Sequence, residues 1–278
     1  MSADASRGEK RGLAVSDLRY VRDGRTVFED LRFSVAPGER VGLYGPPGCG
    51  KSALLRLVAG LEIPAFGRVS WDGRPVAGQD LERGLVLRDN GLFPWLGLLE
   101  NVLMAVEAVR PDRPAAWCRE RAEACLALAG LGDALNRRPL ELSRGGRLRA
   151  SLARALAQES PLLLLDDPLG ALDPGERAGL EELLPRLLAG DAPRRTVLLA
   201  TEDLDEALLL AGRVIGLSPA PGPLVCDEAT PAERPAVRDD LYGAPRFQEL
   251  RRRINDRYRL ERRRRLAARE FFGFGEGI

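Results

Sequence analysis

Residues 45–52 read Gly45-Pro46-Pro47-Gly48-Cys49-Gly50-Lys51-Ser52 and fit the pattern G-x-x-x-x-G-K-[ST] at every fixed position. The apolar run Val41–Tyr44 before them favours a strand, and the run that starts at Ala53 favours a helix. In such a loop, backbone N–H groups and the positive end of the new helix surround phosphate oxygens. A purely structural glycine turn is the alternative. Because strand, loop and helix follow in the required order, we predict that the loop binds the phosphates of a nucleoside triphosphate.

Two residues of this loop have side chains suited to a bound nucleotide. Lys51 is expected to contact the β- and γ-phosphates, and the Ser52 hydroxyl is expected to ligate Mg²⁺. Of the 42 basic residues only Lys10 and Lys51 are lysine. Lys51 therefore stands out, because a compact ammonium fits among phosphates where a broad guanidinium does not. We expect the binding loop to run as far as Ala53 and to hold ATP with Mg²⁺.

Length, charge and cysteine content narrow the class of protein. The 278 residues are enough for one substantial core, and a net charge of +1 gives no general attraction to nucleic acid. No apolar run reaches the roughly 18 residues of a membrane span. Residues 1–11 form a polar leader that we expect to be disordered and that has no apolar signal core, so we expect a cytoplasmic protein. The four cysteines lack C-x-x-C spacing and are predicted to be free thiols, and the chain contains no histidine.

The apolar patterning predicts an α/β fold with two kinds of sheet. Short runs broken by Asp-Gly and Pro-Gly turns predict an antiparallel edge sheet, and they are Leu13–Val15, Val27-Phe28, Leu31–Val35 and Val69–Trp71. The all-apolar runs Leu162–Leu165 and Thr196–Ala200 predict parallel strands buried on both faces. Between these regions the pattern is helical, so we predict an inserted helical subdomain over about residues 89–157.

A second motif follows the apolar run that starts at Leu162. Residues 162–173 read LLLLDDPLGALD, so two carboxylates stand at the end of a predicted strand. Asp166 is expected to hold Mg²⁺, as the strand-end Asp of phosphate-loop proteins does, and Asp167 is expected to face the water that attacks the γ-phosphate. Paired acids that only cap the next turn are the alternative. The phosphate loop in the same chain favours the metal site.

Together these motifs resemble those of the ATP-binding subunits of ABC transporters. The match includes Gly170–Asp173, the segment Leu142–Arg147 and the triplet Thr201-Glu202-Asp203, and it covers roughly residues 12–222. The resemblance implies a P-loop NTPase core of the ABC ATPase type. Gly91–Trp95, followed by Leu99–Val102, resembles the branch that serves nitrate, sulfonate and taurine importers.

The resemblance implies a site shared between two chains. Two such subunits sandwich two ATP molecules, and each site combines one chain's phosphate loop with the other chain's signature segment, here Ser143, Arg144, Gly145 and Gly146. Tyr20 matches the aromatic residue that stacks on adenine, with an edge-strand tyrosine packed on the surface as the alternative. The loop that begins at Arg88 would meet a coupling helix of an integral membrane permease, and a periplasmic solute-binding protein would act indirectly. This places the subunit on the inner face of the cell membrane.

Two departures from the family pattern affect the coupling loop and the signature. Arg88 stands where the family has Gln, and a guanidinium has only donors, so it cannot ligate Mg²⁺ although it can contact a phosphate. Arg144 stands where the family has the first signature Gly, which lets the backbone approach the γ-phosphate. We favour obstruction of that approach by Arg144, with a direct contact between its guanidinium and the phosphate as the alternative.

Two more departures affect hydrolysis itself. Asp167 replaces the catalytic Glu, and its carboxylate is one methylene shorter. Glu202 replaces the switch His, so that an acid faces the terminal phosphate and must repel it or swing away. A displacement of about 1 Å costs about 10²-fold in rate, and general-base help is worth about 10²–10⁴-fold. We therefore predict ATP binding with slow or absent hydrolysis, whether the chain is a weak ATPase or a regulatory subunit.

The C-terminal part carries the least specific signals. Residues 223–245 are expected to be a linker, and residues 246–278 a basic helix or tail whose stripe Phe247, Leu250, Ile254 and Tyr258 has helical spacing. We favour a terminal helix packed on the core over contact with a membrane surface, and that contact over nucleic acid, for which no motif is present. A soluble ABC protein of translation or DNA repair is the rival function. It is disfavoured because no second nucleotide domain, coiled coil or zinc insert is present.

Overall fold

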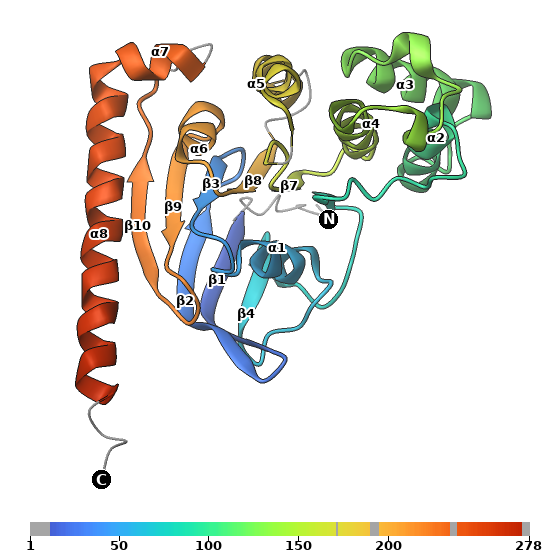
Figure 1. Ribbon diagram of the computed structural model, residues 1–278. Coiled ribbons are helices and arrows are strands. Elements are labelled where there is room, and N and C mark those ends of the chain that lie inside the picture. The colour runs from blue at the N-terminus through green and yellow to red at the C-terminus, as the bar shows by residue number, and fades with distance from the viewer. Residues whose placement is uncertain (1–11, 171, 190–194, 234–237, 274–278) are drawn as a thin grey trace, which may run out of the picture.

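The computed structural model describes residues 12–170, 172–189, 195–233 and 238–273 (Figure 1). The leader expected at residues 1–11 lies outside the described residues, as do Ala171 of the strand-end motif and the last five residues. The fold has a six-stranded sheet, a four-stranded sheet and a group of helices set apart from both (Figure 1). Within the described residues, no helix is long and apolar enough to cross a bilayer.

The six-stranded sheet has the order β10-β9-β3-β8-β7-β6. Its strands are β3 (Arg40–Tyr44), β6 (Arg83–Val86), β7 (Leu162–Asp166), β8 (Thr196–Thr201), β9 (Arg213–Leu217) and β10 (Leu224–Ala229). All neighbouring pairs are parallel except β9 and β10. All five residues of β7 and all six of β8 are buried, as expected for parallel strands covered on both faces. The carboxyl ends of β3, β6, β7 and β8 consequently meet at one edge, where ligands bind in open α/β sheets.

The four-stranded sheet is antiparallel along β2-β1-β4-β5 and confirms the predicted edge sheet. Its strands are β1 (Leu13–Arg22), β2 (Arg25–Val35), β4 (Phe66–Trp71) and β5 (Arg74–Pro75). The two separate strands expected around Phe28 and Phe33 are in fact the single strand β2. Asp30, with a φ of 59°, lies where the pairing with β1 is irregular, so the polar break in the pattern is an irregularity within one strand.

The helices divide into three groups. Helix α1 (Lys51–Ala59) packs between the two sheets, and α5 (Pro174–Ala189) and α6 (Leu204–Leu210) cover the six-stranded sheet (Figure 1). The inserted subdomain contains α2 (Leu98–Val109), α3 (Ala115–Leu128), α4 (Arg144–Ala157) and the 3₁₀ turns Gly132–Ala134 and Pro139–Glu141. Its apolar residues, among them Leu98, Val102 and Leu126, form a core of their own, as the helical pattern predicts.

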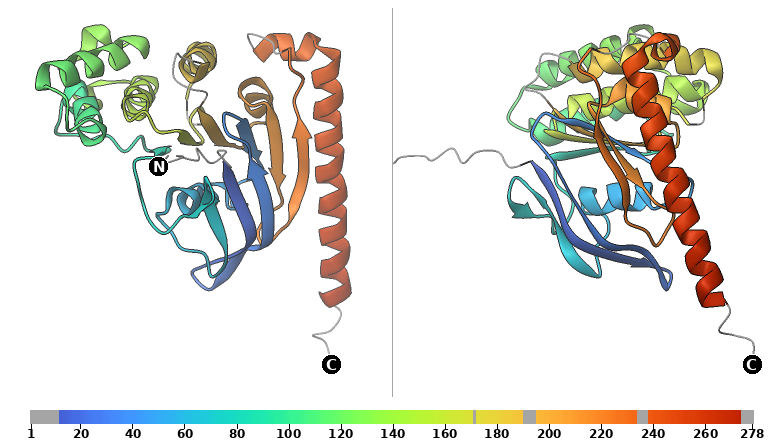
Figure 2. Two further views of the ribbon diagram at one scale, coloured as in Figure 1. Left: turned by 180° about the vertical axis from the view of Figure 1, so that it is seen from behind. Right: turned by 90° about the vertical axis from the view of Figure 1, so that its left-hand side faces the viewer.

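The C-terminal region differs from the prediction of a linker over residues 223–245. Strand β10 lies within that range and pairs with β9, and α7 (Arg238–Gly243) follows it. The prolines and acids of residues 223–245 obscure the strand pattern in the sequence. An edge strand can still form there because it needs only one buried face and a few paired residues. Helix α8 (Pro245–Gly273) then runs along the β10 edge for the height of the molecule (Figure 2). Phe247, Leu250 and Ile254 are buried, which confirms that the helix packs on the core.

Candidate nucleotide-binding site

The phosphate-loop segment leaves the carboxyl end of β3 and enters α1 directly. Gly48 and Gly50 have φ angles of 75° and 99°, a region that glycine adopts without steric cost. A Cβ at Gly45 would lie 2.7 Å from the Leu217 carbonyl oxygen, and one at Gly50 would overlap the Phe28 ring. Conformation and close packing therefore require glycine at these positions, and they give the loop its curled path.

Lys51 is the first residue of α1 and is only 7% exposed. Its ammonium donates hydrogen bonds to the carbonyl oxygens of Gly45 at 2.7 Å and Pro46 at 3.0 Å, so the side chain spans the loop. The Glu202 carboxylate lies 3.7 Å from the same nitrogen. A phosphate that binds to Lys51 must therefore compete with Glu202 for the ammonium.

Ser52 and Asp166, the two predicted metal ligands, are brought together from positions 114 residues apart. The Ser52 hydroxyl donates a hydrogen bond of 2.8 Å to Oδ1 of Asp166, whose side chain ends β7. A hydroxyl and a carboxylate are hard oxygen donors of the kind that Mg²⁺ prefers. The two groups therefore fit the Mg²⁺ that the sequence predicts, and they lie where the phosphate loop enters α1.

Asp167 follows β7 in a left-handed backbone conformation with a φ of 49°. Its N–H donates to the Ala200 carbonyl at 2.9 Å, and a Cβ at Gly170 would overlap its carboxylate, so only glycine leaves room there. Burial raises the pKa of the Asp167 carboxyl, the nearby Arg88 guanidinium lowers it, and Glu202 and Asp166 raise it. The site thus contains three acids, Asp166, Asp167 and Glu202, whose negative charges repel one another.

Arg88 and Asp167, two of the substituted positions, form an ion pair with each other. The guanidinium lies 3.2 Å from Oδ2 of Asp167, and the arginine side chain is 60% exposed while the aspartate is 8% exposed. Glu202, a third substituted position, pairs with Lys51 as described above. The substitutions therefore form a connected set of charges, in which each acid has a basic neighbour. Neither ion pair was expected from the sequence, which predicted only that Glu202 repels phosphate or turns away.

Glu206 on α6 is a residue of this region that the sequence analysis missed. It is 0% exposed, and its Oε2 accepts a 2.7 Å hydrogen bond from the Thr201 hydroxyl, while no partner for Oε1 lies among the described residues. Burial raises the pKa of Glu206 to about 8, with smaller contributions from Asp167 and Asp203. Glu206 is therefore protonated at neutral pH and supports the segment that carries Glu202. No local pattern marks it, because its burial depends on how α6 packs.

Asn101 on α2 is a second residue that the sequence analysis missed. Its side chain is completely buried, accepts from the Phe93 N–H at 2.8 Å and donates to the carbonyls of Phe93, Leu96 and Gly97. These four bonds hold the loop that follows Arg88 in one shape. Trp95 at the tip of this loop is 66% exposed, with its ring 5.5 Å from that of Phe93. The loop thus presents a rigid aromatic surface on the helical subdomain.

The signature segment forms the start of α4. Ser143 caps the helix by accepting a 3.1 Å hydrogen bond from the Gly146 N–H, and Gly145 donates to Glu176 at 3.2 Å. Arg144 is exposed in the first turn. Among the described residues, no hydrogen bond or ion pair joins Ser143, Gly145 or Gly146 to the phosphate loop.

Tyr20 lies on β1 within the core between the sheets. It is only 7% exposed, and its hydroxyl donates a 2.5 Å hydrogen bond to Glu62. Burial, followed by the bond to Glu62, raises the pKa of Tyr20 to about 12. The expectation that Tyr20 stacks on adenine requires an accessible ring face. Its burial differs from the alternative of a tyrosine packed on the surface, and adenine stacking by Tyr20 stays a prediction.

The fold and the glycine-rich loop between β3 and α1 define the class as a P-loop nucleotide-binding cassette. Residues 28–170 match the family described as ABC transporter, and the chain belongs to that family. A solved dimer of the cassette MJ0796, in a post-hydrolysis state bound to ADP and Pi, is similar with a TM-score of 0.70 and 28% identity. The match covers 80% of this chain and 100% of the solved cassette chain.

Two curated relatives confirm the resemblance to importer ATP-binding subunits. The nitrate import ATP-binding protein NrtD of Synechococcus elongatus is 38% identical over 224 residues, which cover 80% of this chain and 81% of that protein. The taurine import ATP-binding protein TauB of Mesorhizobium japonicum is 45% identical over 208 residues, which cover 75% and 79% respectively. The similarity thus extends well beyond the phosphate loop.

Proposed function

We propose that this chain is the ATP-binding subunit of an ABC-type importer and that it binds MgATP at the carboxyl edge of the six-stranded sheet. The grouping of Lys51 with the Ser52–Asp166 pair supports the binding step, because an ammonium and two hard oxygen donors lie beside the same curled loop. Lys51 would hold the β- and γ-phosphates. Bound Mg²⁺ would neutralise phosphate charge, with Ser52 and Asp166 as its protein partners.

The same proposal includes slow or absent hydrolysis. The observation that carries it is the Arg88–Asp167 ion pair, at 3.2 Å. A general base must reach the water that attacks the phosphate, and the shorter side chain of Asp167 is drawn toward a guanidinium instead. The exposed Arg88 has no lone pair for water or metal. Together these features are expected to leave ATP binding possible while they draw the carboxylate of Asp167 away from the attacking water.

The proposed partners follow from the relatives and from the loop held by Asn101. The relatives are named for the import of nitrate and taurine, and both solutes carry an oxyanion group. We propose a cargo of that class, delivered by a periplasmic solute-binding protein to a permease in the membrane. The exposed Trp95 on the loop held by Asn101 would meet that permease, and we propose that the subunit lies on the cytoplasmic face of the membrane.

A second ATP-binding subunit completes the proposed site. In a homodimer, both sites would contain Arg88, Arg144, Asp167 and Glu202 together. With an intact partner, one site would combine the partner's catalytic residues with this chain's Arg144, and that site is the better candidate for turnover. The exposure of Ser143 and Arg144 at the start of α4 supports such an arrangement.

The decisive experiment measures binding and turnover separately. A fluorescent ATP analogue with Mg²⁺ is titrated into the purified chain, and phosphate release is followed under saturating MgATP. We expect saturable binding that Lys51→Ala abolishes, with turnover far below the ordinary enzyme range of about 1–10 s⁻¹. Lys51-dependent turnover within that range would overturn the slow-hydrolysis part. Binding that survives Lys51→Ala would overturn the assignment of the nucleotide site.

A further inference from the structure

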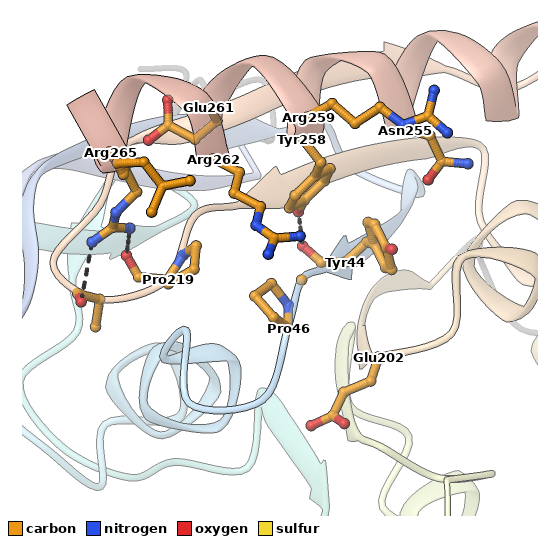
Figure 3. A pocket seen from close by; sticks show the side chains of 13 residues that line it. Tyr44, Pro46, Glu202, Pro219, Asn255, Tyr258, Arg259, Glu261, Arg262 and Arg265 are labelled. Carbon is orange, nitrogen blue, oxygen red and sulfur yellow. Dashed lines mark hydrogen bonds between the residues drawn. The ribbon is translucent and has the colours of Figure 1, made fainter. Parts of the chain in front are cut away.

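A pocket of about 830 Å³ lies between α8 and the start of the phosphate loop (Figure 3). Its walls come from segments far apart in the chain, with Tyr44 and Pro46 on one side, Glu202 below, and Tyr258 and Arg262 on α8. The volume falls within the ~300–1,000 Å³ typical of small-molecule sites. Neither the proposed phosphate contacts of Lys51 nor the Ser52–Asp166 pair uses this space.

The α8 wall of the pocket is basic. Arg259, Arg262 and Arg265 line it at three-residue spacing, so their side chains lie on neighbouring turns of one face. Arg265 is held by the loop after β9, through Ser218 at 2.8 Å and the Pro221 carbonyl at 3.1 Å. Arg259 pairs with Asp256 at 3.1 Å on the surface. Within the described part of the chain, Arg262 forms no hydrogen bond or ion pair, and it points from α8 toward Pro46 and Tyr44 (Figure 3).

Two acids also face the pocket, and both have neighbours that reduce their effect. The Glu202 carboxylate lies 3.7 Å from Lys51, and Glu261 accepts a 3.1 Å hydrogen bond from the Ser218 hydroxyl. Since Arg259 is paired with Asp256 and Arg265 is held by the loop after β9, the positive charge that no described residue pairs on the α8 side is that of Arg262. The lining around Pro46 is largely apolar, because the ring of Tyr44 meets the ring of Tyr258, on α8, edge to face at 5.2 Å. A ligand that suits both the basic and the apolar part of the lining has an anionic head and an apolar body.

We propose that this pocket binds a small organic anion, with its sulfonate, carboxylate or phosphate head on Arg262 and its apolar body against Tyr44, Tyr258 and Pro46. Guanidinium groups bind such heads through charge-assisted hydrogen bonds. Arg262, which pairs with no described residue, and the pocket's apolar lining carry the proposal together, since either alone is common on protein surfaces.

The pocket is connected to the phosphate loop through one side chain. The Tyr258 hydroxyl lies 3.0 Å from the carbonyl of Tyr44 and 3.1 Å from that of Leu217. Tyr44 directly precedes Gly45, whose own carbonyl accepts from Lys51. A ligand between α8 and this loop therefore contacts the backbone that positions Lys51, and it changes the affinity for MgATP. This coupling, unlike the binding of the anion, rests on the proposed function.

The test titrates 1-anilinonaphthalene-8-sulfonate, an organic sulfonate with aromatic rings, into the full chain. The fluorescence of the dye measures its binding. Arg262→Ser is compared with Arg264→Ser, which removes an exposed arginine of the same helix that does not line the pocket. We expect at least about tenfold weaker dye binding for Arg262→Ser, the loss of one charge-assisted contact, and less than about twofold for the control. Circular dichroism verifies that both variants are folded.

Three results would overturn the anion site. These are equal losses in the two variants, equally tight binding of the uncharged analogue N-phenyl-1-naphthylamine, and loss of dye binding in Lys51→Ala, which would move the dye to the phosphate loop. Displacement of the dye by phosphatidylglycerol vesicles but not by a soluble alkyl sulfonate would replace the small ligand with a membrane surface.

The coupling is tested by measuring MgATP affinity with and without saturating dye. We expect a change in the parent chain that Arg262→Ser eliminates, because coupling between two ligands is reciprocal. No change in the parent chain would overturn the coupling alone. Failure to bind MgATP without dye would overturn the proposed function and leave the anion site standing, so the two failures are distinguishable.

Discussion

The two halves of the candidate nucleotide site occupy the same sheet edge but are built differently. In the binding half, Lys51 is buried against loop carbonyls and Ser52 donates to Asp166 at 2.8 Å. In the turnover half, Arg88 pairs with Asp167 at 3.2 Å, and Glu202 reaches across to Lys51 at 3.7 Å. The first half keeps the residues that phosphate and metal require, whereas the second contains one ion pair between two substituted residues and a substituted acid that pairs with Lys51. We therefore expect binding and turnover to depend on separate residues of one edge, so that substitutions can separate them.

The double variant Arg88→Gln/Asp167→Glu is expected to have the largest effect. It removes the ion pair and returns both an oxygen acceptor and a longer carboxylate, so the base reaches the attacking water. We expect the rate of phosphate release to rise about 10²-fold, because a general base displaced by about 1 Å loses about that factor in rate. Nucleotide binding should be unchanged, which serves as the internal control. If release stays at the parent rate, the Arg88–Asp167 pair is not what limits hydrolysis.

Glu202→Gln tests the charge that links the two halves. The substitution removes an acid 3.7 Å from the Lys51 ammonium while keeping nearly the same shape. MgATP then no longer competes with a carboxylate for Lys51, and we expect its affinity to rise about tenfold, equivalent to about 1.4 kcal/mol. Titration with a fluorescent ATP analogue measures the change, and Glu233→Gln on the surface is the control. An unchanged or weaker affinity would show that Glu202 does not oppose phosphate.

Glu206 gives a prediction about pH and stability in the turnover half. Its folded-state pKa of about 8 lies above the ordinary value of 4.5, so the folded chain holds an extra proton between those limits. The contribution of Glu206 to the free energy of unfolding is therefore greatest below pH 4.5, and it falls as the pH rises toward 8.

Between pH 4.5 and 8, Glu206 is expected to lower the free energy of unfolding by up to about 1.4 kcal/mol for each pH unit, and Glu206→Gln is expected to remove this dependence. Urea unfolding of both proteins at pH 6 and pH 8 measures the difference. Equal pH dependence in the two proteins would mean that Glu206 titrates normally.

Arg144→Gly is expected to have the smallest effect in the isolated chain, because the signature segment acts on a partner's site. In the assembled complex we expect ATPase activity to rise, since the backbone of α4 then approaches the γ-phosphate without a long side chain. The rise should appear only when the partner has intact catalytic residues. A fall in activity would instead support the alternative that the Arg144 guanidinium contacts the phosphate.

Much of the site could be predicted from the sequence because its signals are local. The loop from Gly45 to Ser52 specifies its own curled backbone, and four consecutive leucines before Asp166 specify a buried strand that delivers a carboxylate to the sheet edge. Tyr20 shows the limit of this approach. Its position matches an aromatic residue of the family, but its burial and its bond to Glu62 depend on how β1 packs against the rest of the core.

What the sequence by itself determined is the phosphate-loop segment, the strand that ends at Asp166 and the class of fold, since each is encoded by neighbouring residues through backbone conformation and apolar periodicity. Only the tertiary structure decided that Arg88 pairs with Asp167, that Glu206 is buried, and that Tyr258 meets the carbonyl of Tyr44 across 214 residues. Such contacts depend on which strand ends and helix faces are brought together by the packing of the whole chain. Charge and burial at those meeting points cannot be read from short-range pattern, because they arise only when distant segments exclude water from one another.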